Sequence, residues 1–138
     1  MADLVITAAN VLASSSASVA SGIAGATITA GQPLYKDSAD AYALKPAQAD
    51  AATTDEVVGV ALHGAADGQP IQYVVSDSAL NLGATLVAGQ VYVLSAASAG
   101  GVAPISDLTS GNYVSVLGVA TTTSTLKLHV INSGVAKP

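Results

Sequence analysis

The chain contains no cysteine, arginine, phenylalanine or tryptophan, and each absence removes a class of function. Without cysteine there is no disulfide framework, no thiolate metal site and no thiol nucleophile. The four basic residues are all lysines, against nine acidic residues. The chain therefore lacks the clustered cations that displace counterions from phosphates, and we expect no nucleic-acid partner.

Charge and large aromatic side chains are also scarce. Charged residues make up 9% of the chain and hydrophobic residues 51%, whereas an average domain has about 25% charged residues. This composition argues against a disordered chain and against a monomer that stays soluble through surface charge. The only aromatics are five tyrosines, so the core must consist mainly of small aliphatic side chains, which gain less on burial. We expect part of the stability to come from association with other chains.

The N-terminal stretch shows no targeting segment. Residues 1–25 have no basic cluster, and Asn10 and a run of three serines interrupt their apolar residues. The longest apolar runs are far shorter than the roughly 20 residues of a membrane-spanning helix. The sequence thus predicts a soluble product made inside the cell, with no membrane partner.

What the chain does have is an internal repeat. Residues 25–32 read GATITAGQ and residues 83–90 read GATLVAGQ, so six of eight positions are identical at an offset of 58. A second match, VVGVA at 57–61 and VLGVA at 116–120, has an offset of 59. The alternative is a coincidence of a composition rich in Ala and Gly. Two copies are too few for a solenoid, so we expect them to close one shared core.

This repeat divides the chain into an N-terminal arm and one β-domain. The arm is residues 1–24, and the domain is residues 25–138, built from units 25–82 and 83–138. The arm lies outside the duplicated part and so need not complete its core; we expect it to be extended and to be a main contact with other chains.

Turn signals and β-branched runs predict an all-β fold, a small barrel or sandwich. Ala-Gly-Gln turns precede apolar runs in both units, and Asp-Gly at 67–68 is a hairpin signal. The strongest strand candidates are residues 56–62, 71–75, 90–95 and 126–131.

Gly59 and Gly118 lie in the middle of the matched strands. Glycine weakens a strand, so it usually marks a bulge, a bend or a close backbone approach. Its presence in both units predicts a required bend, as in a small barrel.

The histidines give little sign of chemistry. His129 falls on the alternating strand beside Lys127, and His63 comes at a strand end before Gly64, so we interpret both as surface residues. The nucleophile-elbow pattern G-x-S-x-G is absent from the sequence.

Five carboxylates cluster between residues 37 and 56, without the ligand spacing of a calcium loop. They are Asp37, Asp40, Asp50, Asp55 and Glu56. We interpret them as an exposed, solvated acidic loop. The sequence therefore predicts no catalytic, cofactor-binding or metal site, and no enzyme.

The order of motifs nevertheless resembles a known family. The segments that carry the likeness are ITAANVLAS at 6–14, GATITAGQPLYKD at 25–37, VVGVAL at 57–62, GQPIQYV at 68–74, GATLVAGQVYVLSAASAGGVAPISDL at 83–108 and GNYVSVLGVATTTSTLKLHV at 111–130. Together they cover most of the chain, and they are similar to the small head decoration, or capsid cement, proteins of tailed bacteriophages.

This resemblance implies a β-rich virion protein made in the host cytoplasm, with no catalytic residues. Such a protein binds the outer surface of the phage head, often as a homotrimer, and ties neighbouring major capsid subunits together against the pressure of packaged DNA. Two other classes stay open: another virion part, such as a head fibre, tail tube or tail-spike subunit, and a carbohydrate-binding β-module. The latter would need aromatic platforms, which only Tyr35, Tyr42, Tyr73, Tyr92 and Tyr113 could supply.

Overall fold

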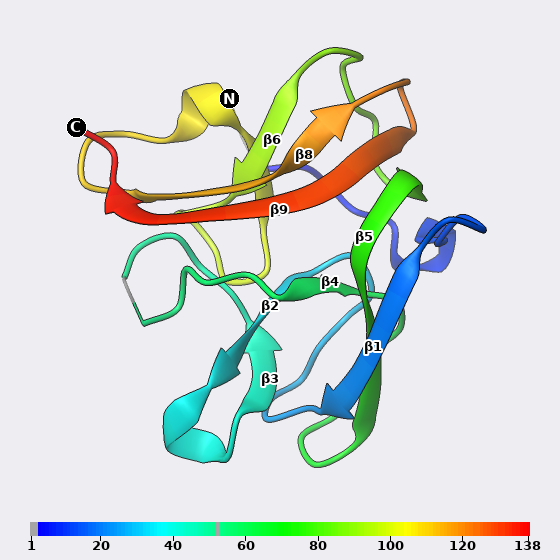
Figure 1. The fold of residues 1–138 in the computed structure, drawn as a ribbon, viewed down its shortest axis with the longest axis vertical. Helices are drawn as coiled ribbons and strands as arrows, with labels where there is room; N and C mark the ends of the chain where they lie inside the picture. The colour runs from blue at the N-terminus through cyan, green and yellow to red at the C-terminus, as the bar shows by residue number, and fades with distance from the viewer. Residues whose placement is uncertain (1–2, 52) are drawn as a thin grey trace.

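The computed structural model describes residues 3–51 and 53–138, and within them the fold is built from strands (Figure 1). Helix in this part of the chain is limited to three short 3-10 turns, η1 (Ala8–Asn10), η2 (Ser38–Asp40) and η3 (Ile105–Asp107). The strands are β1 (Ser18–Ile23), β2 (Pro33–Asp37), β3 (Ala43–Pro46), β4 (Gly59–Ala61), β5 (Pro70–Asn81), β6 (Val91–Leu94), β7 (Val102–Pro104), β8 (Tyr113–Ala120) and β9 (Thr125–Ala136). The expected all-β fold is confirmed.

One curled antiparallel sheet contains all of these strands. Its order is β3-β2-β4-β5-β9-β8-β6-β7, and β1 pairs with β5 outside this path. The two halves of this order have the same connectivity. In the first half β2 pairs with β3 and β4, and β4 with β5; in the second half β6 pairs with β7 and β8, and β8 with β9.

The strand register reproduces the sequence repeat. Leu34 faces Pro46 in the β2–β3 hairpin, and Tyr92 faces Pro104 in the β6–β7 hairpin. Each residue of the first pair is separated from its counterpart by the 58 residues of the sequence offset. The tandem duplication is therefore a property of the backbone pairing as well as of the sequence.

The two mid-strand glycines occupy equivalent places. Gly59 pairs with Leu34, and Gly118 pairs with Tyr92, the counterpart of Leu34. A Cβ at Gly118 would overlap the carbonyl oxygen of Lys127 on the neighbouring strand. The glycines thus permit a close approach of two backbones, one of the three roles that a mid-strand glycine suggests, whereas the sequence had favoured a bend.

Strand β5 belongs to both units. Its first half pairs with β1 and β4, whereas its second half, from Ser76 to Asn81, pairs with β9. Strand β1 and the second half of β5 are separated by the repeat offset of 58 residues. Each is the first strand of its unit: β1 pairs with the first half of β5, and the second half of β5 pairs with β9. The first unit therefore begins at Ser18, and the arm that precedes it is residues 3–17 of the described chain.

The arm completes the second unit. In the first unit, Gly25 donates its N–H to the Leu44 carbonyl of β3 directly, at 2.8 Å. In the second unit the arm lies between the corresponding segments: Leu4 N–H donates to Val102 O (2.8 Å) and Thr7 N–H donates to Gly83 O (2.7 Å). Although the arm lies outside the matched segments of the sequence, these hydrogen bonds join it to Gly83 and to β7.

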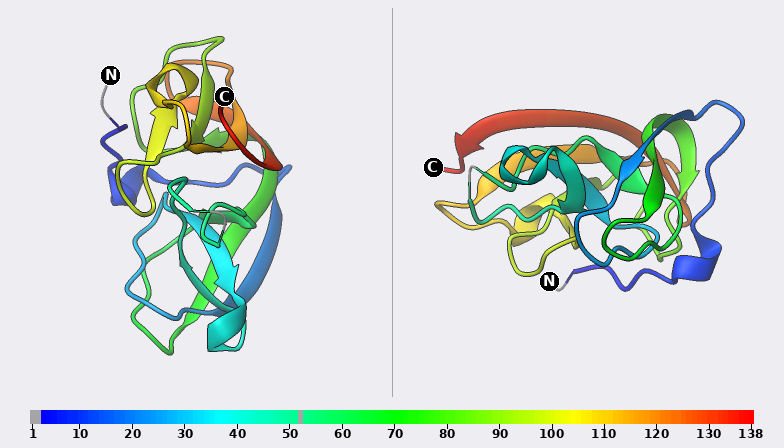
Figure 2. Two further views of the ribbon diagram at one scale, coloured as in Figure 1. Left: turned by 90° about the vertical axis from the view of Figure 1, so that its left-hand side faces the viewer. Right: turned by 90° about the horizontal axis from the view of Figure 1, so that it is seen from below.

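Side chains of the arm also pack inward. Val11 is buried, and Leu4, Ile6, Ala13 and Ala17 are half-buried against the main core. Figure 2 shows the chain from two further sides, with the start of the arm and β9 on opposite faces of the molecule.

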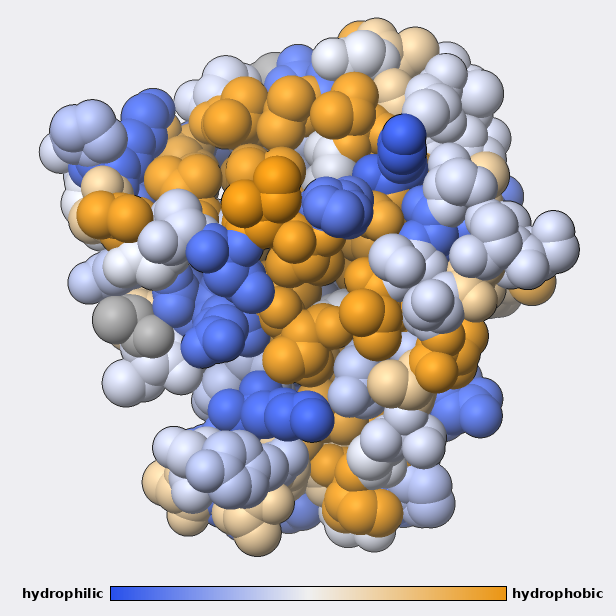
Figure 3. Space-filling view, in the orientation of Figure 1, coloured by the Kyte–Doolittle hydropathy of each residue, from blue (hydrophilic) through white to orange (hydrophobic). Residues whose placement is uncertain are grey.

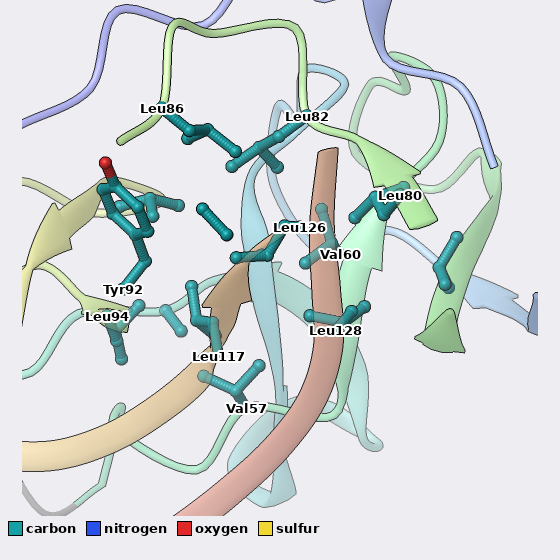
Figure 4. Packing of buried hydrophobic residues seen from close by; sticks show 14 of the residues in the cluster. Val57, Val60, Leu80, Leu82, Leu86, Tyr92, Leu94, Leu117, Leu126 and Leu128 are labelled. Carbon is teal, nitrogen blue, oxygen red and sulfur yellow. The ribbon is translucent and has the colours of Figure 1, made fainter. Parts of the chain in front are cut away.

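Small aliphatic side chains form two core clusters. The larger one joins both units and is shown in Figure 4; the smaller one lies within the first unit, around Leu34, Leu44 and Ile71. Tyr92 is the largest side chain of the main cluster, and its hydroxyl accepts a hydrogen bond from Val87 N–H at 3.0 Å. The polar end of this buried ring is thus satisfied.

Candidate functional site

His63 holds the β4–β5 hairpin together. Its Nε2 accepts a hydrogen bond from Gln72 N–H at 3.1 Å, and its Nδ1 lies 2.9 Å from Gly64 O. A neutral ring with its proton on Nδ1 satisfies both partners. His129 is exposed on β9, as the alternation of residues 126–131 predicted.

The acidic cluster seen in the sequence separates into three places. Asp37 and Asp40 flank Lys45, with oxygens 2.8 and 3.4 Å from its Nζ. The hydrogen bond from Lys45, aided by the N–H of Ala39, lowers the pKa of Asp37. Asp50 lies exposed near the Thr54 hydroxyl, which is 3.5 Å away. Residues 3–51 and 53–138 contain no group of three or more acidic or histidine side chains placed to hold a metal ion.

Asp55 departs from the expected exposed loop. It is 3% exposed, and its Oδ2 is buried with no hydrogen-bond partner among the described residues. Burial raises the pKa of this carboxyl. Asp55 is buried because residues 55–57 pack against the second unit: Ser115 Oγ donates to Asp55 O (2.5 Å), and the Asn132 side chain exchanges two hydrogen bonds with the Val57 backbone. The exposed-loop expectation is wrong at this residue.

A polar cluster that the sequence did not reveal fixes the end of the arm. Asp77 of β5 is buried and accepts hydrogen bonds from Ser14 N–H (2.7 Å), the Ser14 hydroxyl and the Ser16 hydroxyl (3.2 Å). Burial alone would raise the pKa of Asp77, but these bonds and one from Ala79 N–H lower it. The only sequence signal was the serine run at 14–16, which indicated no more than an interruption of the apolar pattern.

Large apolar side chains are exposed on four neighbouring strands. We call this set the strand surface: Val19 and Ile23 on β1, Val75 on β5, Val119 on β8, and Ile131 and Val135 on β9. Val119 of β8 pairs with Lys127 of β9, and His129 and Ile131 are exposed at the next alternate positions of β9. Figure 3 shows hydrophobic atoms gathered through the middle of the side that carries β9.

The tip of the β2–β3 hairpin presents an exposed tyrosine. Ala41 and Tyr42 have positive φ angles of 54° and 60°, in the left-handed region that non-glycine residues rarely adopt. Tyr42 is 66% exposed and lines a shallow hollow with Tyr35, Lys36 and Glu56. The tip is stiffened at its base by Lys45, which bridges Asp37 and Asp40.

Comparison with known proteins finds no family model that matches this chain and no matching curated protein. Helices long and apolar enough to cross a membrane are likewise not found in the described part of the chain.

Proposed function

We propose that this protein is a non-enzymatic structural subunit that binds the outer surface of a phage head and reinforces contacts between major capsid subunits. The observation that carries the proposal is the strand surface. Large apolar side chains left exposed on neighbouring strands mark a candidate interaction site, because leaving them in water forgoes the free energy of burial.

The strand surface suits this role because the backbone hydrogen bonds between its strands hold it rigid. Little conformational entropy is lost on binding when the contacting residues are already ordered. The central strands of this surface also carry little charge, with Lys127 and His129 as its polar neighbours on β9. Repeated attachment of an oligomer to a shell would turn modest single contacts into firm retention.

The resemblance of the motifs to capsid cement proteins supports the choice of a phage head as partner. The arm suits the role of principal contact less well than the sequence suggested, because its backbone is already hydrogen-bonded to the second unit. We therefore assign the shell contact to the strand surface and an intramolecular role to residues 3–17.

The test is binding to heads purified without the protein, measured as occupancy by cryo-electron microscopy and by co-sedimentation. Val119→Ser combined with Ile131→Ser should weaken binding by about tenfold or more, because both are exposed apolar side chains of the strand surface. Val87→Ser is the matched control, since Val87 is 59% exposed but lies on a loop outside the strand surface. Equal occupancy of the double variant and the control would contradict the assignment.

The same images test the other virion locations. Density at a tail tube, a tail spike or a fibre, with bare head surfaces, would replace the cement role with one of those.

A carbohydrate-binding module remains a second candidate, on the strength of the hollow at the hairpin tip. Tyr35 and Tyr42 both line it, and tyrosine rings are the platforms that such a site needs. Titration with a panel of oligosaccharides, followed by tyrosine fluorescence, separates the two functions, because a cement protein should show no saturable quenching.

A further inference from the structure

The outer half of β9 has a neighbouring strand on one side. Strand β5 pairs with β9 from Thr125 to His129 and no further. Beyond that point, residues 131–136 pair with β8 among the described strands, and all six are exposed. Strand segments with few buried contacts open at a lower free-energy cost than the core does. Any further contact that this half of β9 makes therefore matters for its order.

The side chain of Asn132 supplies such a contact. Its Nδ2 donates to Val57 O and its Oδ1 accepts from Val57 N–H, each at 2.9 Å. We call these two hydrogen bonds the clasp. The clasp joins the outer half of β9 to the first unit, directly beside Ile131, which is 56% exposed and belongs to the strand surface.

The clasp holds only while residues 55–57 lie against the second unit, and Asp55 is part of that segment. Its backbone carbonyl accepts from the Ser115 hydroxyl of β8 at 2.5 Å. Its carboxyl is 3% exposed, and Oδ2 has no hydrogen-bond partner among the described residues. An ionised carboxylate in such a place is costly, whereas the neutral acid is tolerated.

The groups around Asp55 offer no compensating positive charge. Strands β8 and β9 meet its segment through the Ser115 hydroxyl and the Asn132 amide, and both are neutral. The titratable side chains on the same three elements are Asp50, Glu56, Tyr113, Lys127 and His129, and no described hydrogen bond or ion pair joins any of them to the Asp55 carboxyl. Burial, and after it the charge of Glu56, raises the pKa of Asp55.

We propose that Asp55 makes the clasp sensitive to pH, so that the protonated acid keeps residues 55–57 closed on β8 and β9, and the ionised acid opens them and frees residues 131–136. Opening brings the carboxylate into water, and the gain in hydration favours it. Because Ile131 and Val135 belong to the strand surface, the clasp would also regulate shell binding, a consequence that rests on the proposed function.

The direction of the pH dependence follows from the raised pKa of Asp55 in the closed form. The closed form has its full stability below the pKa of a solvated aspartate, about 3.9, and loses stability as pH rises through the closed-state pKa. Acidic conditions should therefore order the outer half of β9, and neutral conditions should loosen it.

Amide exchange measured by NMR at pH 5 and pH 7, expressed as protection factors that correct for the intrinsic rate, tests the proposal. In the wild type, Val57 and residues 131–136 should be severalfold better protected at pH 5. Asp55→Asn should give the higher protection at both pH values, because the neutral amide cannot ionise. Asn132→Ala should give low protection at both, because the clasp is gone. Asp67→Asn, at an exposed carboxyl of another loop, should keep the wild-type pH dependence.

Adding low concentrations of urea separates local opening from global unfolding. Exchange at Val57 should depend little on urea, because local opening exposes little surface. The reference is Ile28, which is 1% exposed and donates its N–H to Ala65 O in the core of the first unit. A wild-type pH profile that Asp55→Asn leaves unchanged, or a urea dependence at Val57 as steep as at Ile28, would overturn the proposal. No phage head enters the measurement, so its failure and that of the shell-binding test are distinguishable.

Discussion

Replacing Gly118 by alanine tests the duplicated bend most directly. Gly118 faces Leu128 across the β8–β9 pair. A Cβ at this position would overlap the Lys127 carbonyl oxygen and lie 2.9 Å from its carbonyl carbon. Carbon and oxygen in ordinary contact are about 3.3 Å apart or more. Because the obstacle is backbone, the two strands must separate by about 1 Å rather than turn a side chain aside.

The expected cost follows from that separation. Forcing one extra methyl group into a packed place costs about 1–3 kcal/mol. Stretching the ladder hydrogen bonds on either side adds about 1 kcal/mol. We therefore expect Gly118→Ala to lower the free energy of unfolding by about 2–4 kcal/mol. For a chain of this length the unfolding entropy is about 0.3 kcal/mol per degree, so the melting temperature should fall by about 10 °C.

Urea unfolding, monitored by circular dichroism, measures the change. Gly59→Ala should behave alike, because a Cβ there would overlap Val74 O and lie 2.6 Å from the Tyr73 ring. Gly64→Ala is the control: its nearest neighbour would be Ile28 O at 3.4 Å, so its effect should stay within about 0.5 kcal/mol. A Gly118→Ala protein within 0.5 kcal/mol of wild type, at an unchanged denaturant slope, would refute the close-approach argument.

Three further predictions concern the carboxylates and the arm. Asp77→Asn should destabilise the protein at neutral pH and speed amide exchange in residues 11–17. Because the pKa of Asp77 is lowered in the folded protein, the extra free energy of unfolding of the wild type is present above the unfolded pKa of about 3.9 and is lost as pH falls through the folded pKa. Asp55→Asn should have the opposite effect and stabilise the protein at neutral pH. Because the pKa of Asp55 is raised in the folded protein, the wild type loses stability as pH rises from the unfolded pKa through the folded pKa, and urea midpoints should show the gain of the variant at pH 7 but not at pH 3. Removal of residues 2–11 should lower the melting temperature and expose the seam between Gly83 and β7 to amide exchange, and an unchanged melt would show that the arm's hydrogen bonds add nothing to stability.

Much of the fold could be predicted because its determinants are local or repeat along the chain. The alternation of residues 126–131 placed Leu126 and Leu128 inward and Lys127 and His129 outward, and the structure agrees. The matched motifs predicted a duplication, and the strand register confirms it, because the matched segments form hairpins with the same pairing at the same sequence offset.

The candidate surfaces were harder to predict. Nothing in the order of residues singles out Tyr42 beyond its aromatic ring, because its left-handed backbone shows only in the three-dimensional structure.

By itself, then, the amino-acid sequence determined the fold class, the two-unit plan and the equivalence of the two mid-strand glycines, since these depend on side-chain size and spacing along the chain. The tertiary structure alone decided where the arm goes and which carboxylates are buried. Those outcomes depend on contacts such as Thr7 with Gly83 and Ser14 with Asp77, which join residues far apart in the chain. Such contacts form only once the two units have packed, because the free energy that selects them comes from burial and hydrogen bonding across the assembled sheet.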